Sequence, residues 1–172
     1  MIIGDPYKFA VMFDKVNDWI LSDSYDNGHF ALCLDGKMIP DHLINAVIST
    51  SLYNVLSVLK NIPDNKKLFF QGKEQLFSSI YDMAYPSDFE CENDYRYVLS
   101  PTVITDESCF VFVVRNNDMI RIIGSSELEY DSYESHHILD NAVITEVTLN
   151  KHEIDNIINQ IEKTWSDLCV TN

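Results

Sequence analysis

Residues 108–124, which read SCFVFVVRNNDMIRIIG, predict a β-hairpin around which the rest of the chain is arranged. Both arms are rich in β-branched residues, and the first arm also carries two phenylalanines, which favours strands. Asn116, Asn117 and Asp118 tolerate the left-handed backbone that a tight reversal needs. The first arm is apolar without a break from Phe110 to Val114. Such a strand is typically buried on both faces, so we expect it in the middle of a sheet covered by helices.

Further strands are predicted on both sides of this hairpin. Alternation or short apolar runs indicate strands over residues 7–16, 95–99 and 142–149. Residues 43–48 fit a strand or a helix, and a strand is favoured. Residues 28–40 predict a second hairpin, because Asp35-Gly36 is a favoured pair for a two-residue turn and Pro40 then ends the pairing. Residues 17–27 and 125–140 are mostly polar, and we expect irregular loops there.

Three segments have the apolar spacing of amphipathic helices: residues 51–61, with Ser49 or Thr50 as N-cap, residues 73–84 and residues 151–168. Asn150 and Glu153 are spaced as an N-cap and its reciprocal partner at the start of the last helix. Residues 67–70 are either a short strand or the lead-in to the second helix. Strands and helices do not alternate regularly. This order predicts an α+β fold, a mostly antiparallel β-sheet with two or three packed helices including a C-terminal one.

The length of 172 residues predicts a single domain spanning residues 1–172. None of the four cysteines forms a CxxC pair with another, and we expect all four to be reduced, as in the cytoplasm. The N-terminus lacks the basic and apolar regions of a signal peptide. No apolar run is long enough to span a membrane. We therefore expect neither a signal peptide nor a membrane span, and the sparse use of cysteine agrees with the cytoplasm.

The charge balance is the clearest compositional signal, with 27 acidic against 12 basic residues and a net charge of −15. Such a surface repels nucleic acid and anionic lipid and attracts basic partners. Solubility alone is the alternative explanation, because many soluble proteins are acidic.

Motifs that carry chemistry are absent from the sequence. The five glycines form no phosphate-binding loop, and there is no G-x-S-x-G or H-E-x-x-H motif. His136 and His137 are adjacent, so their side chains diverge, and we expect solvated loop residues rather than metal ligands. With 27 carboxylates, no pair stands out as general acid and base. We predict no catalytic residue, no metal and no cofactor.

Between Asp82 and Asp140, 13 acidic residues face only three basic ones. Nine of the 13 lie in two acidic stretches, residues 87–94 and residues 125–140. Tyrosines lie among the carboxylates of the second stretch, and tyrosine is frequent among residues that dominate protein interfaces. The residues predicted to contact a basic protein are Asp88, Glu90, Glu92, Asp94, Glu127, Glu129, Tyr130, Asp131, Tyr133 and Glu134.

The opening octapeptide Ile3–Ala10, IGDPYKFA, is followed by a strand with Asp14. This is the specific part of a pattern that resembles the immunity protein 42 family. Weaker points of similarity follow in the same order, namely Asn27-Gly28, Phe30-Ala31-Leu32, Asp35-Gly36-Lys37, Tyr85-Pro86, Arg121-Ile122-Ile123-Gly124 and the helix start at Lys151–Glu153.

The resemblance implies a bacterial cytoplasmic protein of a polymorphic toxin or contact-dependent growth inhibition system, which binds and neutralises the toxic C-terminal domain of its cognate secreted toxin. It implies an inhibitor and not an enzyme, and it supplies no catalytic or toxin-contacting residue. Gly4, Asp5 and Pro6 are interpreted as a structural turn. Many such toxins are nucleases, which are basic where they grip phosphates. Electrostatically complementary occlusion of a basic nuclease is therefore the predicted mechanism.

Two other functions stay open from the sequence. One is an acidic binding or adaptor module for another basic protein, which would lack a toxin gene beside it. The other is a small, divergent hydrolase, which would require a cleft where a histidine, a carboxylate and a nucleophile converge. The sequence carries no signal for the oligomeric state.

Overall fold

The computed structural model describes the chain except for residues 17–25, 89, 127, 132–135, 140–141 and 171–172. Side chains are also left aside at positions 136, 138 and 168–170. The prediction for residues 17–27 therefore falls largely outside the described residues.

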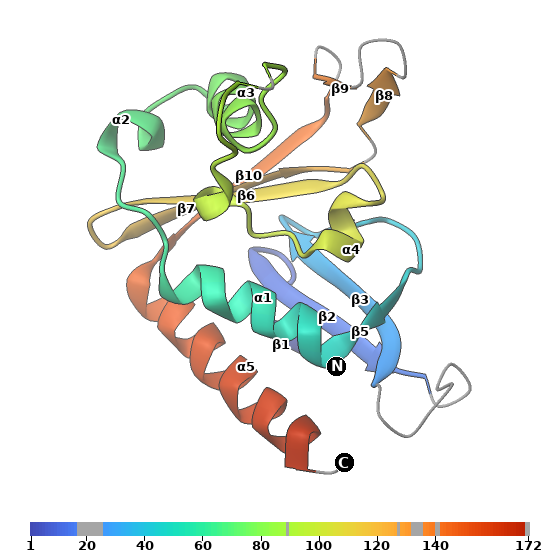
Figure 1. Cartoon of the computed structure of the whole chain (residues 1–172). Coiled ribbons are helices and arrows are strands. Elements are labelled where there is room, and N and C mark those ends of the chain that lie inside the picture. Colours follow the sequence, from blue (N-terminus) through green and yellow to red (C-terminus); the bar gives the residue numbers. More distant parts are fainter. Residues whose placement is uncertain (17–25, 89, 127, 132–135, 140–141, 171–172) are drawn as a thin grey trace.

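Two antiparallel sheets and one short hairpin contain the described strands (Figure 1). The N-terminal sheet has the order β1-β2-β3-β4, with β5 also paired to β3: β1 Ile2–Gly4, β2 Phe9–Lys15, β3 Asn27–Leu34, β4 Lys37–Ile39 and β5 Asn45–Val47. The second sheet has the order β10-β7-β6: β6 Phe110–Asn116, β7 Met119–Ser125 and β10 Ile144–Asn150. β8 Glu129–Asp131 pairs with β9 His136–Ile138.

Three long helices pack on these sheets, together with two one-turn helices and the 3-10 turn η2: α1 Ile48–Lys60, α2 Lys66–Phe69, α3 Lys73–Ala84, η2 Tyr95–Tyr97, α4 Thr102–Thr105 and α5 Lys151–Val170. Helices α1 and α5 lie side by side on one face of the second sheet, and α3 lies on the opposite face (Figure 1). The predicted α+β class, with antiparallel sheets and a C-terminal helix, is confirmed.

The central hairpin explains this layering. Successive side chains of a strand point to opposite faces. Phe110, Phe112 and Val114 pack in the core beneath α3, whereas Val111 and Val113 pack in the core shared with α1 and α5. The unbroken apolar run is thus a strand buried on both faces, as predicted. β7 is the middle strand of its sheet, however, and β6 lies at one side, where only an isolated bridge between Val98 and Phe112 continues the pairing.

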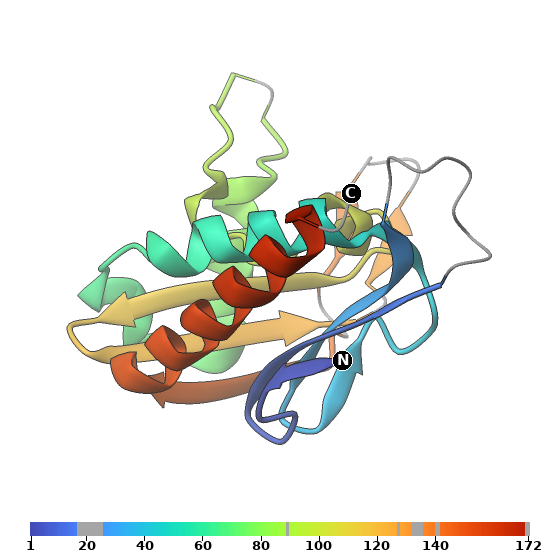
Figure 2. The ribbon, with the colours of Figure 1, turned by 90° about the horizontal axis from the view of Figure 1, so that it is seen from below.

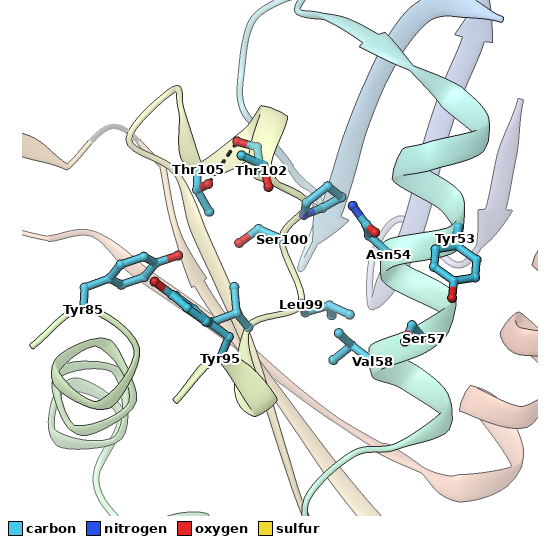
Figure 3. Close-up of a pocket in the computed structure, with 12 residues that line it drawn as sticks. Tyr53, Asn54, Ser57, Val58, Tyr85, Tyr95, Leu99, Ser100, Thr102 and Thr105 are labelled. Atoms are coloured by element: carbon cyan, nitrogen blue, oxygen red, sulfur yellow. Dashed lines mark hydrogen bonds between the residues drawn. The ribbon is translucent and has the colours of Figure 1, made fainter. Parts of the chain in front are cut away.

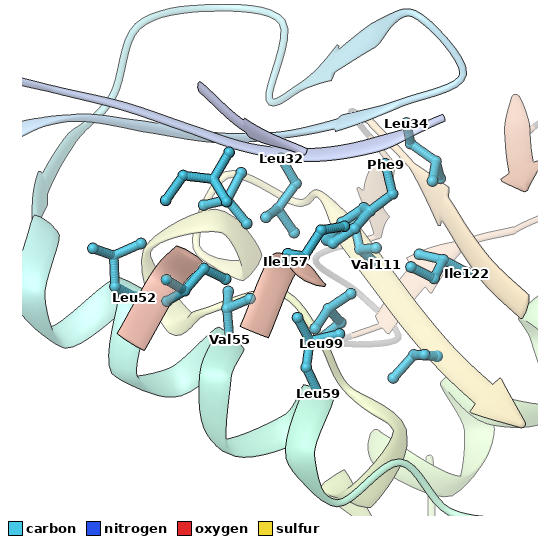
Figure 4. Packing of buried hydrophobic residues seen from close by; sticks show 14 of the residues in the cluster. Phe9, Leu32, Leu34, Leu52, Val55, Leu59, Leu99, Val111, Ile122 and Ile157 are labelled. Atoms are coloured by element: carbon cyan, nitrogen blue, oxygen red, sulfur yellow. The ribbon is translucent and has the colours of Figure 1, made fainter. Parts of the chain in front are cut away.

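The larger core lies between the N-terminal sheet, helices α1 and α5, and the second sheet (Figure 4). Leu52, Val55 and Leu59 of α1 point into it, opposite Phe9 and Leu32 of the strands. These are positions of the predicted apolar stripe of α1. Truncating such a fully buried side chain to alanine typically destabilises a protein by about 2–5 kcal/mol.

Of the two N-caps predicted from the sequence, one is confirmed and one is wrong. The cap of α5 is confirmed: Asn150 Oδ1 accepts from the Glu153 amide at 3.0 Å, and Glu153 Oε2 accepts from the Asn150 amide at 2.9 Å. The predicted N-cap of α1 is wrong, since α1 begins earlier and Asp26 caps it from a distant part of the chain. Asp26 accepts from the Ser49 amide at 2.9 Å and from Ser49 Oγ at 2.8 Å.

Other predictions were wrong in short segments whose structure is set by local hydrogen bonds. Residues 95–99 form η2 and one bridge instead of a strand, because the Asp94 side chain accepts from the Arg96 amide and starts a helical turn. Residues 67–70 belong largely to helix α2, which Asn65 caps. The stretch 125–140, expected to be irregular, contains the β8–β9 pair. Strand β1 and helix α4 were not predicted.

Candidate functional site

The first acidic stretch is the loop that follows α3, and it projects away from the body of the molecule (Figure 2). α3 buries Leu76, Phe77 and Ile80, and its last turn supplies carbonyl oxygens to which the loop is tied. The Asp94 amide donates to the Met83 oxygen at 2.8 Å, and the Asn93 side chain donates to the Ala84 oxygen at 2.8 Å. These bonds tie the far end of the loop back to the helix end from which the loop starts.

Four of the predicted contact residues lie on this loop, with different environments. Asp88, Glu90 and Glu92 are exposed. Asp94 is instead held by Arg96, whose Nε and Nη2 donate to its two carboxylate oxygens at 2.8 and 2.7 Å. The hydrogen bonds from Arg96 lower the pKa of Asp94 below its usual range. Asp94 therefore shapes the loop, and its charge is locally compensated.

The second acidic stretch contributes the β8–β9 hairpin. Glu129 and Tyr130 are exposed, and Asp131 is half-buried. Glu127, Tyr133 and Glu134 lie outside the described residues.

His137 fixes this hairpin to the rest of the fold. Its Nδ1 lies 2.7 Å from the Tyr81 hydroxyl of α3, and its Nε2 lies 3.0 Å from Ser108 Oγ, just before β6. Burial raises the pKa of Tyr81, so its hydroxyl stays protonated. Both ring nitrogens of His137 thus lie at hydrogen-bond distance from a neutral hydroxyl group. The expectation that His137 is a solvated loop residue is wrong, because folding brings a distant helix and turn to both ring nitrogens.

This cluster also bears on the hydrolase alternative. Ser108 and His137 are at hydrogen-bond distance, but the third group is the hydroxyl of Tyr81, a core residue that is 4% exposed. A serine–histidine–carboxylate triad is thus not formed at this histidine. Among the described residues, no three histidine, cysteine or acidic side chains are placed to hold a metal ion.

A chain of aromatic rings joins the two acidic stretches. Tyr130 contacts His137 at 5.1 Å between ring centroids, and His137 contacts Phe110 at 4.9 Å. Phe110 contacts Tyr85 at 5.2 Å, which contacts Tyr95 at 5.7 Å. The two end tyrosines are about half exposed, at 53% and 54%. The described parts of the two stretches therefore flank one packed aromatic unit at the same end of α3.

A cleft of about 480 Å³ opens beside this unit (Figure 3). One wall is α1, with Tyr53, Asn54 and Ser57, and the other carries Tyr85 and Tyr95. The segment from Val98 to Thr102, which covers the side of β6, forms the floor. Tyrosine, hydroxyl and amide groups line it, and none of its lining residues is charged. No local pattern in the sequence indicates this cleft, because its lining comes from two separate segments, residues 53–58 and residues 85–105.

The hydroxyl of Tyr85 stays protonated in this setting. Burial, with smaller contributions from Tyr95, Tyr81 and Asp106, raises the pKa of Tyr85 to about 12. It therefore acts as a neutral hydrogen-bonding group at physiological pH.

Nearly the whole chain matches one protein family: residues 1–164 match the family model described as immunity protein 42. The chain belongs to the immunity protein 42 family. This confirms the resemblance inferred from the opening octapeptide.

Among solved structures, this immunity protein is similar to the crystal structure of CdiI from Burkholderia dolosa AUO158. The TM-score is 0.74 at 21% sequence identity, over 95% of this chain and 99% of that chain. At this identity the likeness shows the fold. No curated protein matches the chain. Family membership supports a toxin-neutralising immunity role and suggests an inhibitor without catalysis.

The octapeptide of this immunity protein has a structural role. Gly4 has φ +101°, and a Cβ there would lie 2.5 Å from the Phe9 oxygen. Asp5 Oδ1 accepts from the Tyr7 amide at 2.9 Å, and the Asp5 oxygen accepts from the Lys8 amide at 2.9 Å. The octapeptide thus makes the tight connection between β1 and β2. None of the described helices is sufficiently long and apolar to cross a membrane.

Proposed function

We propose that this protein binds the toxic C-terminal domain of a cognate secreted bacterial toxin and blocks it by covering its working surface. Membership of the immunity protein 42 family is the observation that carries the proposal. In this proposal the protein is cytoplasmic, acts by binding and not by catalysis, and needs no cofactor.

We further propose that the target is basic, and that it is a nuclease. The support is the distribution of charge: Asp88, Glu90, Glu92 and Glu129 are exposed and make no ion pair within the described residues. A nuclease carries cations where it holds phosphates. An acidic surface laid over them occupies the site of the substrate and accelerates encounter at low salt.

The proposed contact surface is the acidic surface, defined as the full set predicted from the sequence: Asp88, Glu90, Glu92, Asp94, Glu127, Glu129, Tyr130, Asp131, Tyr133 and Glu134. Its described members lie around one aromatic unit. A stable complex typically buries roughly 800 Å² of surface on each partner.

Co-expression tests the immunity role directly. The C-terminal domain of the large secreted protein encoded beside this gene is induced in a laboratory bacterial strain, with or without this chain. We expect growth only when both are present, and a stable complex in a pull-down. Continued killing in the presence of the folded chain would refute the proposal. An adaptor for another basic protein would leave the killing unchanged.

Charge reversal tests the electrostatic mechanism. Glu129→Lys with Asp131→Lys should slow association with the toxin domain and reduce its salt dependence. The matched control is Asp14→Lys with Glu74→Lys, which makes the same change in net charge on β2 and at the start of α3. Equal association rates for the two double variants would contradict a local electrostatic contact. Nuclease assays of the free toxin domain, with and without this chain, then test whether the target is a nuclease.

A further inference from the structure

The cleft between α1 and the tyrosines that follow α3 has the features of the centre of a protein interface, and no other part of the described chain fills it. Tyr53 and Tyr95 stand on opposite walls and are 56% and 54% exposed. Large aromatic side chains that remain half exposed beside a hollow are typical of sites where a partner inserts.

Each of these two tyrosines packs against a second aromatic ring of the fold. Tyr53 packs against Trp165 of α5 at 6.1 Å between ring centroids, and Tyr95 packs edge-to-face on Tyr85 at 5.7 Å. A side chain whose rotamer is already fixed loses less entropy when a partner binds. The walls of the cleft are thus preorganised for a partner.

Hydrogen-bonding groups in the cleft are available to a partner. Ser100 is already used, since its Oγ accepts from the Val111 amide at 3.1 Å. The side chains of Asn54, Ser57 and Thr102 make no hydrogen bond within the described residues. The lining itself carries no charge, so an occupant must bring its own apolar or polar contacts rather than a matching ion pair.

The surroundings of the cleft decide the charge of the occupant. Residues 85–107, which form one wall, the floor and the adjoining loop, include six carboxylates and one cation, Arg96. Arg96 is paired with Asp94. Asp106 lies near enough to Tyr85 to raise its pKa. Positive charge is therefore favoured at the rim, and an arginine or lysine stem can lie across the tyrosine faces.

We propose that this cleft receives a protruding, basic loop of the toxin domain and supplies the main energy of binding, while the acidic surface steers the encounter. The proposal rests on the proposed function and names the contact site within it. An uncharged aromatic centre inside a charged rim is the arrangement in which a few central residues control dissociation and rim charges control association.

Dissociation kinetics test this division of roles. The probe is the C-terminal domain encoded beside the gene, released from the co-purified complex by denaturant and refolded. Tyr95→Ala should raise the dissociation rate roughly 30-fold, the effect of a hot-spot residue, with little change in the association rate or its salt dependence. Ser57→Trp fills the cleft from an exposed position of α1 and should weaken binding without unfolding the helix.

Tyr7→Ala is the matched control, because Tyr7 is a 78% exposed tyrosine outside the cleft. Its dissociation rate should equal that of the unchanged chain. Thermal unfolding of each variant separates loss of fold from loss of contact.

Each outcome decides between the two levels of the proposal. If the unchanged chain neither protects nor binds, the proposed function fails, and this inference fails with it. If it binds and neither cleft variant changes dissociation, only the cleft inference is wrong. If Ser57→Trp abolishes a concentration-dependent dimer of this chain while toxin binding is unchanged, the cleft is a self-association surface and the inference is equally overturned.

Discussion

Arg121 is the side chain whose loss should destabilise the fold most clearly, and Arg121→Met removes its charge while keeping much of its apolar length. The Arg121 side chain is 11% exposed, and its guanidinium forms hydrogen bonds in two directions. Nε donates to Glu146 Oε2 at 2.8 Å, and Nη1 donates to the Phe69 and Gln71 oxygens at 2.8 and 2.7 Å. It thus ties the linker before α3 to the middle strand of the second sheet.

The size of the effect follows from what is left behind. Two backbone oxygens lose a charged donor, and each such loss is typically worth about 1–3 kcal/mol when no other partner is found. Glu146 is 34% exposed, so water can rehydrate its carboxylate and the full penalty of an isolated buried charge does not apply. We expect Arg121→Met to lower the free energy of unfolding by about 3 kcal/mol. For a domain of this size, that lowers the Tm by roughly 6–12 °C.

Urea unfolding followed by circular dichroism measures this loss, and Arg115→Met is the matched control. Arg115 is on the neighbouring strand β6, but its side chain is 41% exposed and its Nε lies 3.8 Å from Asp64. A surface pair of this kind contributes at most about 1 kcal/mol. If the two variants lose equal stability, or if Arg121→Met loses less than about 1 kcal/mol, the structural account of Arg121 is refuted.

Three further predictions concern local features. Asn150→Ala removes the cap of α5 and should lower the unfolding free energy by about 1 kcal/mol in urea unfolding, with no change of fold by circular dichroism. The pKa of Glu153 lies below its usual 4.5, chiefly because Lys8 hydrogen-bonds to it, so this stabilisation is present above that pH and is lost on acidification. The unfolding free energies of the unchanged chain and Glu153→Gln should therefore converge as the pH falls from about 5 to 3, and a constant difference would contradict this. Gly4→Ala should lower the free energy of unfolding by more than about 1 kcal/mol, because φ at Gly4 is positive and an added Cβ has no space. Gly72→Ala should lower it far less, because nothing lies within 4 Å of a Cβ added there, and thermal unfolding of both variants measures the difference.

The sequence predicts best those elements whose signal is local and repeated. The Phe110–Val114 run, the apolar stripe of α3 and the Asn150 cap each depend on residues within a few positions of one another. The Asp35-Gly36 turn is of the same kind, and both residues have positive φ, at 50° and 76°. In each case propensity, periodicity and tertiary packing favour the same structure.

The predictions that failed depend on residues distant in sequence. Helix α1 is capped by Asp26, more than 20 positions before Ser49, and His137 is held by Tyr81 and Ser108. No periodicity reports such pairs. Residues 95–99 have the composition of a strand, but the Asp94 side chain starts a helical turn there. Strand pairing is limited to a single bridge to Phe112. The cleft could not be predicted for the same reason, because it exists only once α1 and the segment after α3 are brought together.

The ion pairs of the described residues show which carboxylates are compensated within the fold. Several cations of α1, α5 and the central hairpin form ion pairs within the fold, as in Lys60–Glu162, Lys151–Asp155 and Arg121–Glu146. Residues 122–150 contain six acidic residues and no lysine or arginine. Stability therefore accounts for the carboxylates that face a cation, Asp94 among them. It gives no reason for the exposed carboxylates Glu90, Glu92 and Glu129, which make no ion pair within the described residues and whose negative charge opposes folding. A partner that supplies the missing positive charge is the physical explanation that the proposed function offers, and it requires the loops to lose their effect on association when salt screens them.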